Sequence, residues 1–368
     1  MIYLDYGATS FRKPPAVYRA VQNALHTCAN PGRGGYDAAK SAADVVFGCR
    51  EAAGELFDCL PEQVVLTTSC THGLNIAVRS IVKPGSTVVI SGFEHNAVTR
   101  PLHALGAEIR VAGRRLFDWE DTLKSFEKQL PGADAAVFTH VSNVFGYILP
   151  VQQMAQLCRD RGIPFIIDAA QSAGTLPVSL ETLGADFIAM PGHKGLLGPQ
   201  GTGLLLCREG TEPLFYGGTG SYSRQQTMPP ELPDRLEPGT LNVPGYAGLR
   251  EGLRYVKKTG VDWIFSREHQ LLQTCIHGLQ KAGMKVFSGP HQASTASFLP
   301  GMDCEEAAEK LARQGIAVRA GLHCAPYAHE SAGTLETGTV RVSVGYDTFP
   351  GQIAAFLRAA SKMPGFVQ

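Results

Sequence analysis

The stretch PGHKGLLGPQGTG at residues 191–203 places a lysine, Lys194, inside a glycine-rich turn. Short apolar runs flank the turn, at residues 187–189 and 204–206. A lysine that follows a buried strand in this way can be held rigidly and partly out of water, which lowers the pKa of its amine and suits it to form a Schiff base. A solvated lysine in a surface loop is the other interpretation that the turn alone allows.

Similar apolar runs recur upstream of the turn, separated by stretches with helical character. They lie at residues 64–66, 87–90, 135–138 and 165–167. Apolar runs that do not alternate with polar residues are typical of a parallel sheet covered by helices on both faces. We therefore predict a large α/β domain over residues 15–244, with a mostly parallel sheet and a site beyond the carboxyl ends of its strands.

The rest of the chain, residues 1–14 and 245–368, predicts a smaller α+β domain. Residues 216–244 are rich in Gly, Pro and Ser, which is typical of a long connector. The elements expected after it are a helical stretch at about 246–282, strands near 295–298, 317–319 and 340–343, and helices at 304–314 and 349–361.

The charge balance favours a small-molecule substrate. Thirty-three basic residues match thirty-three acidic ones in a chain of 368, without a long run of either sign, so neither nucleic acid nor membrane is expected as a partner. The first residues lack the features of a signal peptide, and no apolar stretch reaches the ~18 residues that span a bilayer, so a cytoplasmic location is expected. The nine cysteines include no C-x-x-C pair, and no metal site is expected.

Asp168 ends the apolar run at residues 165–167, where an unpaired carboxylate is costly. The pyridinium nitrogen of pyridoxal 5′-phosphate (PLP) is a cation that would pair with it, and the pairing keeps the ring protonated. A helix N-cap is the alternative role for Asp168, but it would leave Lys194 unexplained.

Three more polar segments follow predicted strands. Residues 67–75, TTSCTHGLN, open a helix and suit an anion such as a phosphate, or merely cap the helix. His95 can stack on an aromatic ring and carry protons, although a lone histidine is more often structural. Asn143 offers an amide to a ring hydroxyl. Because these segments all follow strands of one predicted sheet, we expect them to meet at one rim.

Together these residues resemble the class V, fold-type I PLP-dependent enzymes, and within them the cysteine desulfurases. The resemblance runs from LDYGAT at residues 4–9 to beyond Arg341. Its most specific parts are His193-Lys194, Asp168 with Gln171, Glu94-His95, Ser142-Asn143 and RAGLHC at residues 319–324. It implies a fold-type I transferase with a seven-stranded sheet.

The resemblance also implies roles for individual residues. Lys194 would form the Schiff base with PLP, Asp168 would pair with the pyridine nitrogen, and His95 would stack on the ring. Asn143 and Gln171 would flank the ring hydroxyl. The phosphate would be held by Cys70, Thr71 and His193, and across a homodimer by Thr240 of the other subunit.

Cys324 would be the nucleophile that accepts sulfur from L-cysteine, leaving L-alanine and an enzyme persulfide for a sulfur-acceptor protein. Its short loop resembles that of the second group of desulfurases. Arg319 and Arg341, with Asn143, are candidates for binding the substrate carboxylate, because guanidinium can bind it in a bidentate way. Either arginine can instead belong to an ordinary ion pair.

Two other functions remain open from the sequence. One is a different class V enzyme, such as a selenocysteine lyase acting on L-selenocysteine, an aminotransferase or an epimerase, in which Cys324 is incidental. The other is a non-enzymatic scaffold. The chain departs from its relatives at Pro191, where many have a hydroxyl residue, at His72, where many have an acid, and over residues 325–340, including HESAG at 329–333.

Overall fold

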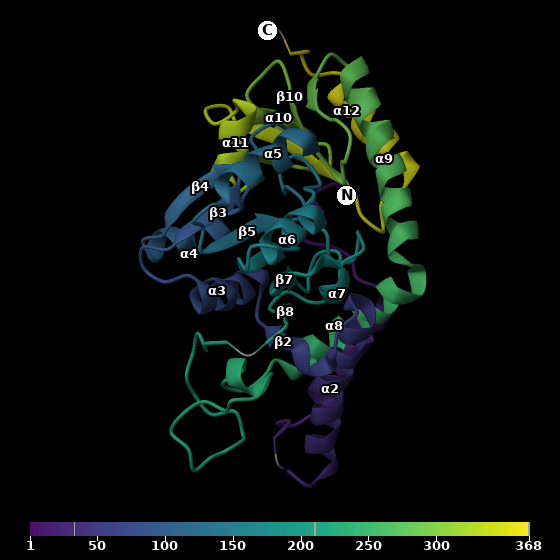
Figure 1. Cartoon of the computed structure of the whole chain (residues 1–368). Helices are drawn as coiled ribbons and strands as arrows, with labels where there is room; N and C mark the ends of the chain where they lie inside the picture. Colours follow the sequence, from purple (N-terminus) through teal and green to yellow (C-terminus); the bar gives the residue numbers. More distant parts are fainter. Residues whose placement is uncertain (33, 210, 367–368) are drawn as a thin grey trace.

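The structure is a computed structural model that describes residues 1–32, 34–209 and 211–366. Within these residues, a seven-stranded sheet in the order β2-β8-β7-β6-β5-β3-β4 forms the centre of the molecule (Figure 1). Its strands are β2 (Val64–Thr67), β3 (Thr87–Ser91), β4 (Glu108–Ala112), β5 (Ala135–Thr139), β6 (Phe165–Asp168), β7 (Phe187–Pro191) and β8 (Gly203–Cys207). Strands β3 to β7 are parallel, and β8 is antiparallel to both of its neighbours. The predicted α/β fold with a mostly parallel sheet is confirmed.

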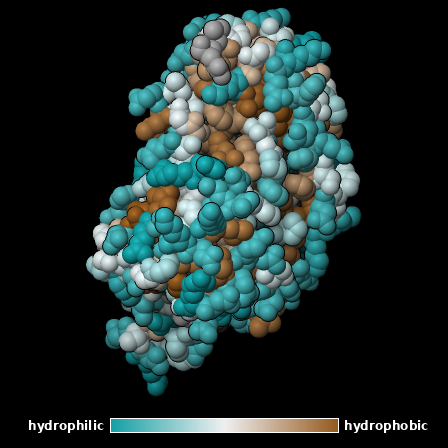
Figure 2. Space-filling model, turned by 45° about the horizontal axis from the view of Figure 1, so that its top comes forward, coloured by the Kyte–Doolittle hydropathy of each residue, from teal (hydrophilic) through white to brown (hydrophobic). Residues whose placement is uncertain are grey.

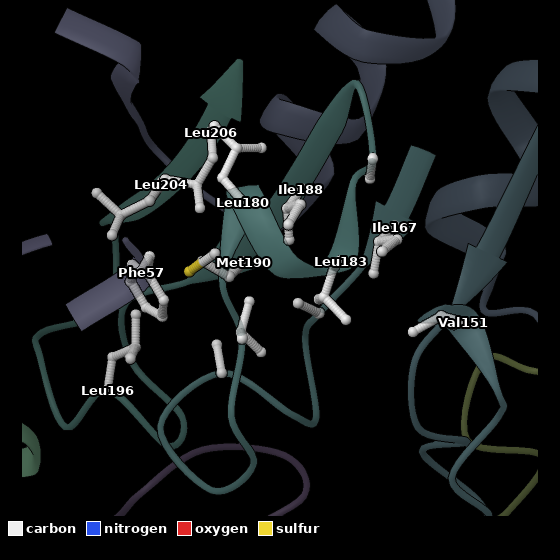
Figure 3. Close-up of a cluster of buried hydrophobic side chains, with 14 of the residues drawn as sticks. Phe57, Val151, Ile167, Leu180, Leu183, Ile188, Met190, Leu196, Leu204 and Leu206 are labelled. Carbon is white, nitrogen blue, oxygen red and sulfur yellow. The ribbon is translucent and has the colours of Figure 1, made fainter. Parts of the chain in front are cut away.

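Helices cover both faces of this sheet. They are α1 (Pro15–Thr27), α2 (Asp37–Phe57), α3 (Cys70–Ile81), α4 (Asn96–Ala104), α5 (Trp119–Gln129), α6 (Val151–Arg159), α7 (Leu180–Leu183) and α8 (Val243–Thr259), with 3₁₀ turns η1 (Pro61–Gln63) and η2 (Asp234–Leu236). Neighbouring strand residues belong to different cores: Ile166 packs toward α3 and α4, whereas Ile167 packs with Phe57 of α2 and Val151 of α6 (Figure 3). Successive strand side chains point to opposite faces, so burial of both faces explains why the apolar runs do not alternate.

A second, antiparallel sheet lies above the first in Figure 1. Its order is β12 (Arg319–Gly321), β13 (Thr339–Ser343), β10 (Thr295–Leu299), β9 (Lys285–Phe287), and it is accompanied by α9 (Val261–Lys281), α10 (Cys304–Ala312), α11 (Pro326–Ala332) and α12 (Pro350–Ala360). The short strands β1 (Ile2–Tyr3) and β11 (Ile316–Ala317) pair in parallel beside it. Leu4 joins the core of this second sheet, so the two ends of the chain fold together.

Two expected elements are divided in the structure. The helical stretch at 246–282 breaks at Gly260, whose φ of 86° is a conformation that glycine adopts readily. Before the break, α8 packs against α1 and α2, and after it α9 packs against α12 and β9. The expected strand at 317–319 spans parts of β11 and β12, which belong to different sheets. The domain boundaries after residues 14 and 244 stay a prediction.

The surface shown in Figure 2 is mostly hydrophilic, with apolar patches between the polar areas. In the part of the chain that the structure describes, no helix is long and apolar enough to cross a membrane.

The connector before α8 leaves the sheet as open loops at the lower left of Figure 1. A buried ion pair anchors its end: Glu237 accepts hydrogen bonds from both terminal nitrogens of Arg50, with Nη1 at 2.7 Å, and also from the backbone N–H of Leu66 in β2. The side chains are only 8% and 4% exposed. The pair therefore ties α2, the edge of the sheet and the connector together.

Arg50→Met removes the cation and leaves the Glu237 carboxylate buried, so we expect the free energy of unfolding to fall by about 3–5 kcal/mol. Urea unfolding followed by tryptophan fluorescence measures the loss. Arg12→Ala, which breaks the exposed ion pair with Asp347, is the matched control and should leave the curve nearly unchanged. Equal losses in the two variants would contradict the role of the Arg50–Glu237 pair as an anchor.

Candidate active site

A cavity of about 530 Å³ opens at the carboxyl ends of the central strands, where ligand sites of open α/β sheets lie. Its lining comes from five predicted segments and consists of Ser69, Cys70, Thr71, His95, Ala97, Thr139, Val141, Asn143, Asp168, Ala170, Gln171, Pro191, His193 and Lys194. The structure thus brings together every predicted site residue except Thr240, Arg319, Arg341 and Cys324.

Lys194 follows β7 in a turn packed too closely for ordinary side chains. A Cβ on Gly195 would overlap the carbonyl oxygen of Ala173, and one on Gly252 of α8 would overlap that of Leu196. Lys194 is only partly exposed, through the cavity that it lines. Desolvation is the main cause that lowers the pKa of its amine, and repulsion from Arg341 is the next. The negative charge of Asp168 opposes the shift. An amine in this state is a nucleophile and a base.

Asp168 is the last residue of β6 and is 3% exposed. One carboxylate oxygen, Oδ1, accepts hydrogen bonds from the Ala170 N–H at 2.8 Å and from the Cys70 thiol at 3.4 Å. Among the described residues, no cationic side chain lies within ion-pair distance of this carboxylate. Asp168 is therefore a buried carboxyl group that faces a cavity without a cationic partner among the described residues.

His95 is the N-cap of α4, which begins directly after β3. Its Nδ1 accepts the Ala97 N–H at 3.0 Å, so the proton of the neutral ring is on Nε2. Burial lowers the pKa of His95. The preceding residue, Glu94, is fully buried and accepts hydrogen bonds from Ser91 of β3 and from the N–H of Thr139 of β5, at 2.9 Å to Oε1. Glu94 thereby holds together the two strand ends beside His95.

Hydrogen bonds from outside the sheet fix the remaining lining residues. Asn143 donates its amide to the carbonyl of His323 at 2.7 Å, and Gln171 donates to the carbonyl of Gly7 at 2.9 Å. The carbonyl of His193 accepts from four donors of the N-terminal segment, namely Thr9 Oγ1, Ser10 N, Ser10 Oγ and Lys13 Nζ. The N-terminal segment therefore holds the lysine turn in place.

Arg319 and Arg341 share one carboxylate, that of Asp5. Arg341 Nη2 lies 2.7 Å from Oδ1, and Arg319 Nη2 lies 2.9 Å from Oδ2. Arg341 also donates through Nη1 to the carbonyl of Asn143 at 3.0 Å, while its buried Nε has no hydrogen-bond partner in the described part of the chain. Either arginine would have to give up a contact with Asp5 to bind a substrate carboxylate in two places, so that role stays a prediction.

Cys324 lies at the edge of this arrangement. Its carbonyl accepts the N–H of Asn96, next to His95, at 2.7 Å, and the preceding carbonyl of His323 accepts from Asn143. All nine cysteines are described, and Cys324 is the exposed one among them. The structure therefore joins an exposed thiol to two walls of the cavity.

Thr240 lies elsewhere. It is exposed and lines a separate cavity with Asn30, Gly32 and Gly239, at the end of the connector. A role toward the phosphate of another subunit stays a prediction.

Sequence reasoning missed several residues that shape the site. Asp5, Thr9 and Ser10 lie in or next to the quoted LDYGAT segment, but their partners are hundreds of residues away and no local signal shows the pairing. Glu268 of α9 was also missed: it is 3% exposed and lines a second cavity that shares Lys194 and Gln171 with the first. Burial raises the pKa of Glu268 to about 8.

In the described residues, no group of three or more His, Cys, Asp or Glu is arranged to hold a metal ion.

Comparison with known proteins places this architecture in a family. The family model described as Aminotransferase class-V matches residues 2–356. The chain belongs to the class V aminotransferase family. Enzymes of this family are generally PLP-dependent.

Similar proteins carry more specific names. A probable cysteine desulfurase of Xylella fastidiosa (strain 9a5c) is 31% identical over 99% of this chain and 91% of its own length. One of Methanothermobacter thermautotrophicus is 30% identical, covering 94% of this chain and 90% of that protein. The apo structure of the cysteine desulfurase of Thermococcus onnurineus NA1 superposes with a TM-score of 0.90 at 30% identity, covering 98% of this chain and 94% of the other. The cysteine desulfurase CsdA of Escherichia coli gives 0.85 at 26% identity, with the same coverage.

The raised pKa of Glu268 predicts a change in stability with pH. Its folded pKa of about 8 exceeds the value of about 4.3 of an unfolded glutamate, so the folded state keeps a proton that the unfolded state loses in this interval. The stabilisation is complete below the unfolded pKa and is lost as pH rises through the folded pKa. As pH rises from about 5 to about 8, the free energy of unfolding of Glu268→Gln should therefore increase relative to that of the wild type. The increase should be up to about 1.4 kcal/mol for each pH unit.

Urea unfolding at a series of pH values measures this difference. Glu336→Gln, at an exposed position, is the control. A constant difference between Glu268→Gln and the wild type over this range would show that Glu268 is charged in the folded protein.

Proposed function

We propose that this chain binds PLP and is a cysteine desulfurase that converts L-cysteine to L-alanine and takes up the sulfur on Cys324. The observation that carries the desulfurase proposal is the exposed Cys324 in a turn tied to the cavity walls, where the Asn96 N–H donates to the Cys324 carbonyl and the Asn143 amide donates to the His323 carbonyl. The names of the similar proteins support the same activity.

The chemistry of the cavity fits PLP. Asp168 is a buried carboxylate without a protein counter-ion, and Lys194 is an amine with a lowered pKa that lines the same cavity. Asp168 would hold the pyridine nitrogen, His95 would stack on the ring, and Asn143 and Gln171 would flank its hydroxyl. The start of α3, with Cys70 and Thr71, and His193 would hold the phosphate. When bound, PLP supplies an electron sink that stabilises negative charge on the substrate carbon.

The chain supplies the proton transfers and the sulfur acceptor. Lys194 removes the Cα proton of the substrate in its neutral form, which the lowered pKa of its amine favours. The Cys324 thiolate then attacks the substrate sulfur: the S–S bond forms, the C–S bond breaks, and its electron pair stays with the substrate carbon. Protonation of that carbon, and return of a proton to Cα by Lys194, gives L-alanine and leaves a persulfide on Cys324. Exposure of Cys324 lets a sulfur-acceptor protein reach that persulfide.

We also propose that the active protein is a homodimer. The end of the connector is fixed by the buried Arg50–Glu237 pair, while Thr240, three residues later, is exposed and lines a different cavity from the one that contains Lys194. This placement suits a residue that acts on the phosphate bound by the other subunit.

The PLP proposal is tested by mapping the linked lysine. After incubation with PLP and reduction with borohydride, we expect the pyridoxyl group on Lys194, and we expect Lys194→Ala to lose the visible absorption band of the linked cofactor. Lys13 is the internal control, because its pKa is also lowered, to about 8, and it lies beside the same turn. Stoichiometric labelling of another lysine in the wild type would overturn the assignment of Lys194.

The desulfurase proposal is tested at Cys324. Cys324→Ser should lower turnover of L-cysteine by more than about a thousandfold, because the nucleophile itself is removed. Activity on L-selenocysteine should persist, since the weaker C–Se bond lets selenium leave without a protein thiolate. Cys28→Ser, at the partly buried Cys28, is the matched control.

If Cys324→Ser desulfurates L-cysteine at the wild-type rate, and mass spectrometry finds no persulfide on Cys324 of the wild-type protein during turnover, this mechanism is rejected while the PLP assignment stays intact. The chain would then be a lyase or another class V enzyme.

A further inference from the structure

The turn that carries Cys324 has an unusual backbone. It joins β12 to α11, and both His323 (φ 50°) and Cys324 (φ 56°) adopt the left-handed conformation. Each such residue costs about 1–2 kcal/mol, because its Cβ approaches the following carbonyl oxygen. Two in succession persist only where surrounding contacts hold them, and such strain is concentrated at functional sites.

Contacts from three elements hold the turn in place. The N–H of Asn96 and the amide of Asn143 each donate to one of its carbonyls at 2.7 Å. The His323 ring points inward, with Nε2 3.2 Å from the carbonyl oxygen of Thr339 in β13. These contacts fix the side of the turn that faces the cavity and the second sheet.

His329 of α11 packs against the ring of His323. The ring of His329 is fully buried. Its centroid lies 5.8 Å from the ring centroid of His323 and 6.0 Å from that of Phe145. Its Nδ1 lies 2.8 Å from the hydroxyl oxygen of Thr334, which fixes the plane of the ring. His329 also belongs to the segment where the sequence departs from the second group of desulfurases.

Helix α11 is itself anchored to the part of the chain that carries His95. The hydroxyl of Ser331 donates to the carbonyl of Gly92 at 2.8 Å, just after β3, and Glu330 pairs with Arg114 at 3.4 Å. A side chain on α11 is therefore a fixed support for the turn.

A role as a proton acceptor does not explain why His323 and His329 lie beside Cys324. Burial lowers the pKa of His323 to about 2 and that of His329 to about 4. The positive charge of Arg341 adds to the shift at His323, and the nearby Leu322 and Thr334 oppose the shift at His329. Both rings are neutral and weakly basic at neutral pH, so neither is suited to take the proton of the Cys324 thiol.

We propose that His329 is a positioning residue for the nucleophile: its ring, oriented by Thr334, packs behind His323 and holds Cys324 in the left-handed conformation that presents the thiol to the substrate sulfur. The proposal rests on the proposed function, because it assigns a task to His329 only where Cys324 accepts sulfur. It adds a residue that acts through the turn and does not touch substrate or cofactor.

The test separates activity that needs Cys324 from activity that does not. His329→Ala removes the support and should lower turnover of L-cysteine between about tenfold and a hundredfold, the range that follows from small misplacements of a reacting group. Turnover of L-selenocysteine and the absorption band of bound PLP should stay at wild-type levels. Thr334→Val keeps the ring but frees its orientation, and should give a smaller loss in the same direction.

A second readout does not depend on turnover. In the protein without substrate, alkylation of Cys324 by iodoacetamide should become severalfold faster in His329→Ala, because the turn is released, while alkylation of Cys28 stays unchanged. His269→Ala, which removes a partly buried histidine of α9 far along the chain, is the matched control and should alter neither quantity.

The outcomes are distinct. An equal loss on both substrates, or no loss on either together with an unchanged alkylation rate, overturns the positioning role. If His329→Ala does not fold, Thr334→Val decides by the same two readouts. If Cys324→Ser desulfurates L-cysteine at the wild-type rate, the proposed function fails, and the alkylation rate still decides whether His329 holds the turn.

Discussion

The site depends on how this fold keeps two basic side chains, Lys194 and Arg341, close to two carboxylates, Asp5 and Asp168, and largely out of water. Lys194 and Arg341 repel one another, and burial lowers the pKa of both. Asp5 balances Arg341 through an ion pair of 2.7 Å, and Asp168 opposes the shift at Lys194 without approaching it closely enough to pair. The charge of Arg341 is thus balanced by direct contact with a carboxylate. Within the described part of the chain, Lys194 has no such contact, which favours loss of its proton. Removing Asp5 would leave Arg341 buried without a counter-ion, a far larger penalty than the loss of an exposed pair.

This arrangement explains why the ends of the chain fold together. Asp5 comes from the N-terminal segment, Arg319 and Arg341 from β12 and β13, and Asn143 from the loop after β5. The same N-terminal segment supplies four donors to the carbonyl of His193. The ion pairs and the clamp therefore set the position of the second sheet relative to the lysine turn. The N-terminal strand β1 is only two residues long, so polar contacts, more than strand pairing, hold this segment.

The sequence was informative wherever a residue's environment is decided locally. Runs such as residues 165–167 are apolar on both faces, so β6 and the position of Asp168 at its end could be predicted. Strand β4, at the edge of the sheet, is not predicted because Glu108 and Arg110 interrupt its apolar residues, as suits a strand whose side chains are mostly partly exposed. Apolar residues continue at helical spacing on both sides of Gly260, so the sequence predicts a single helix there. Only the positive φ of Gly260 separates α8 from α9. The pairing of Asp5 with Arg319 and Arg341 could not be foreseen, since it depends on how the two sheets dock.

Physical chemistry also distinguishes between the two cysteines closest to the site. Cys70 lines the cavity, but burial and the neighbouring Asp168 raise its pKa well above the usual range, so it remains a thiol. A thiol is a poor nucleophile, and Cys70 is buried, so an acceptor protein has little access to it. Cys324 is exposed, so it is accessible to a partner outside the protein. Proton transfer from the substrate carbon favours a desolvated amine, whereas sulfur transfer out of the protein requires an accessible thiol. The Lys194 amine and the Cys324 thiol therefore belong on different elements. The hydrogen bonds of Asn96 and Asn143 to the turn that carries Cys324 fix the position of that turn relative to the cavity.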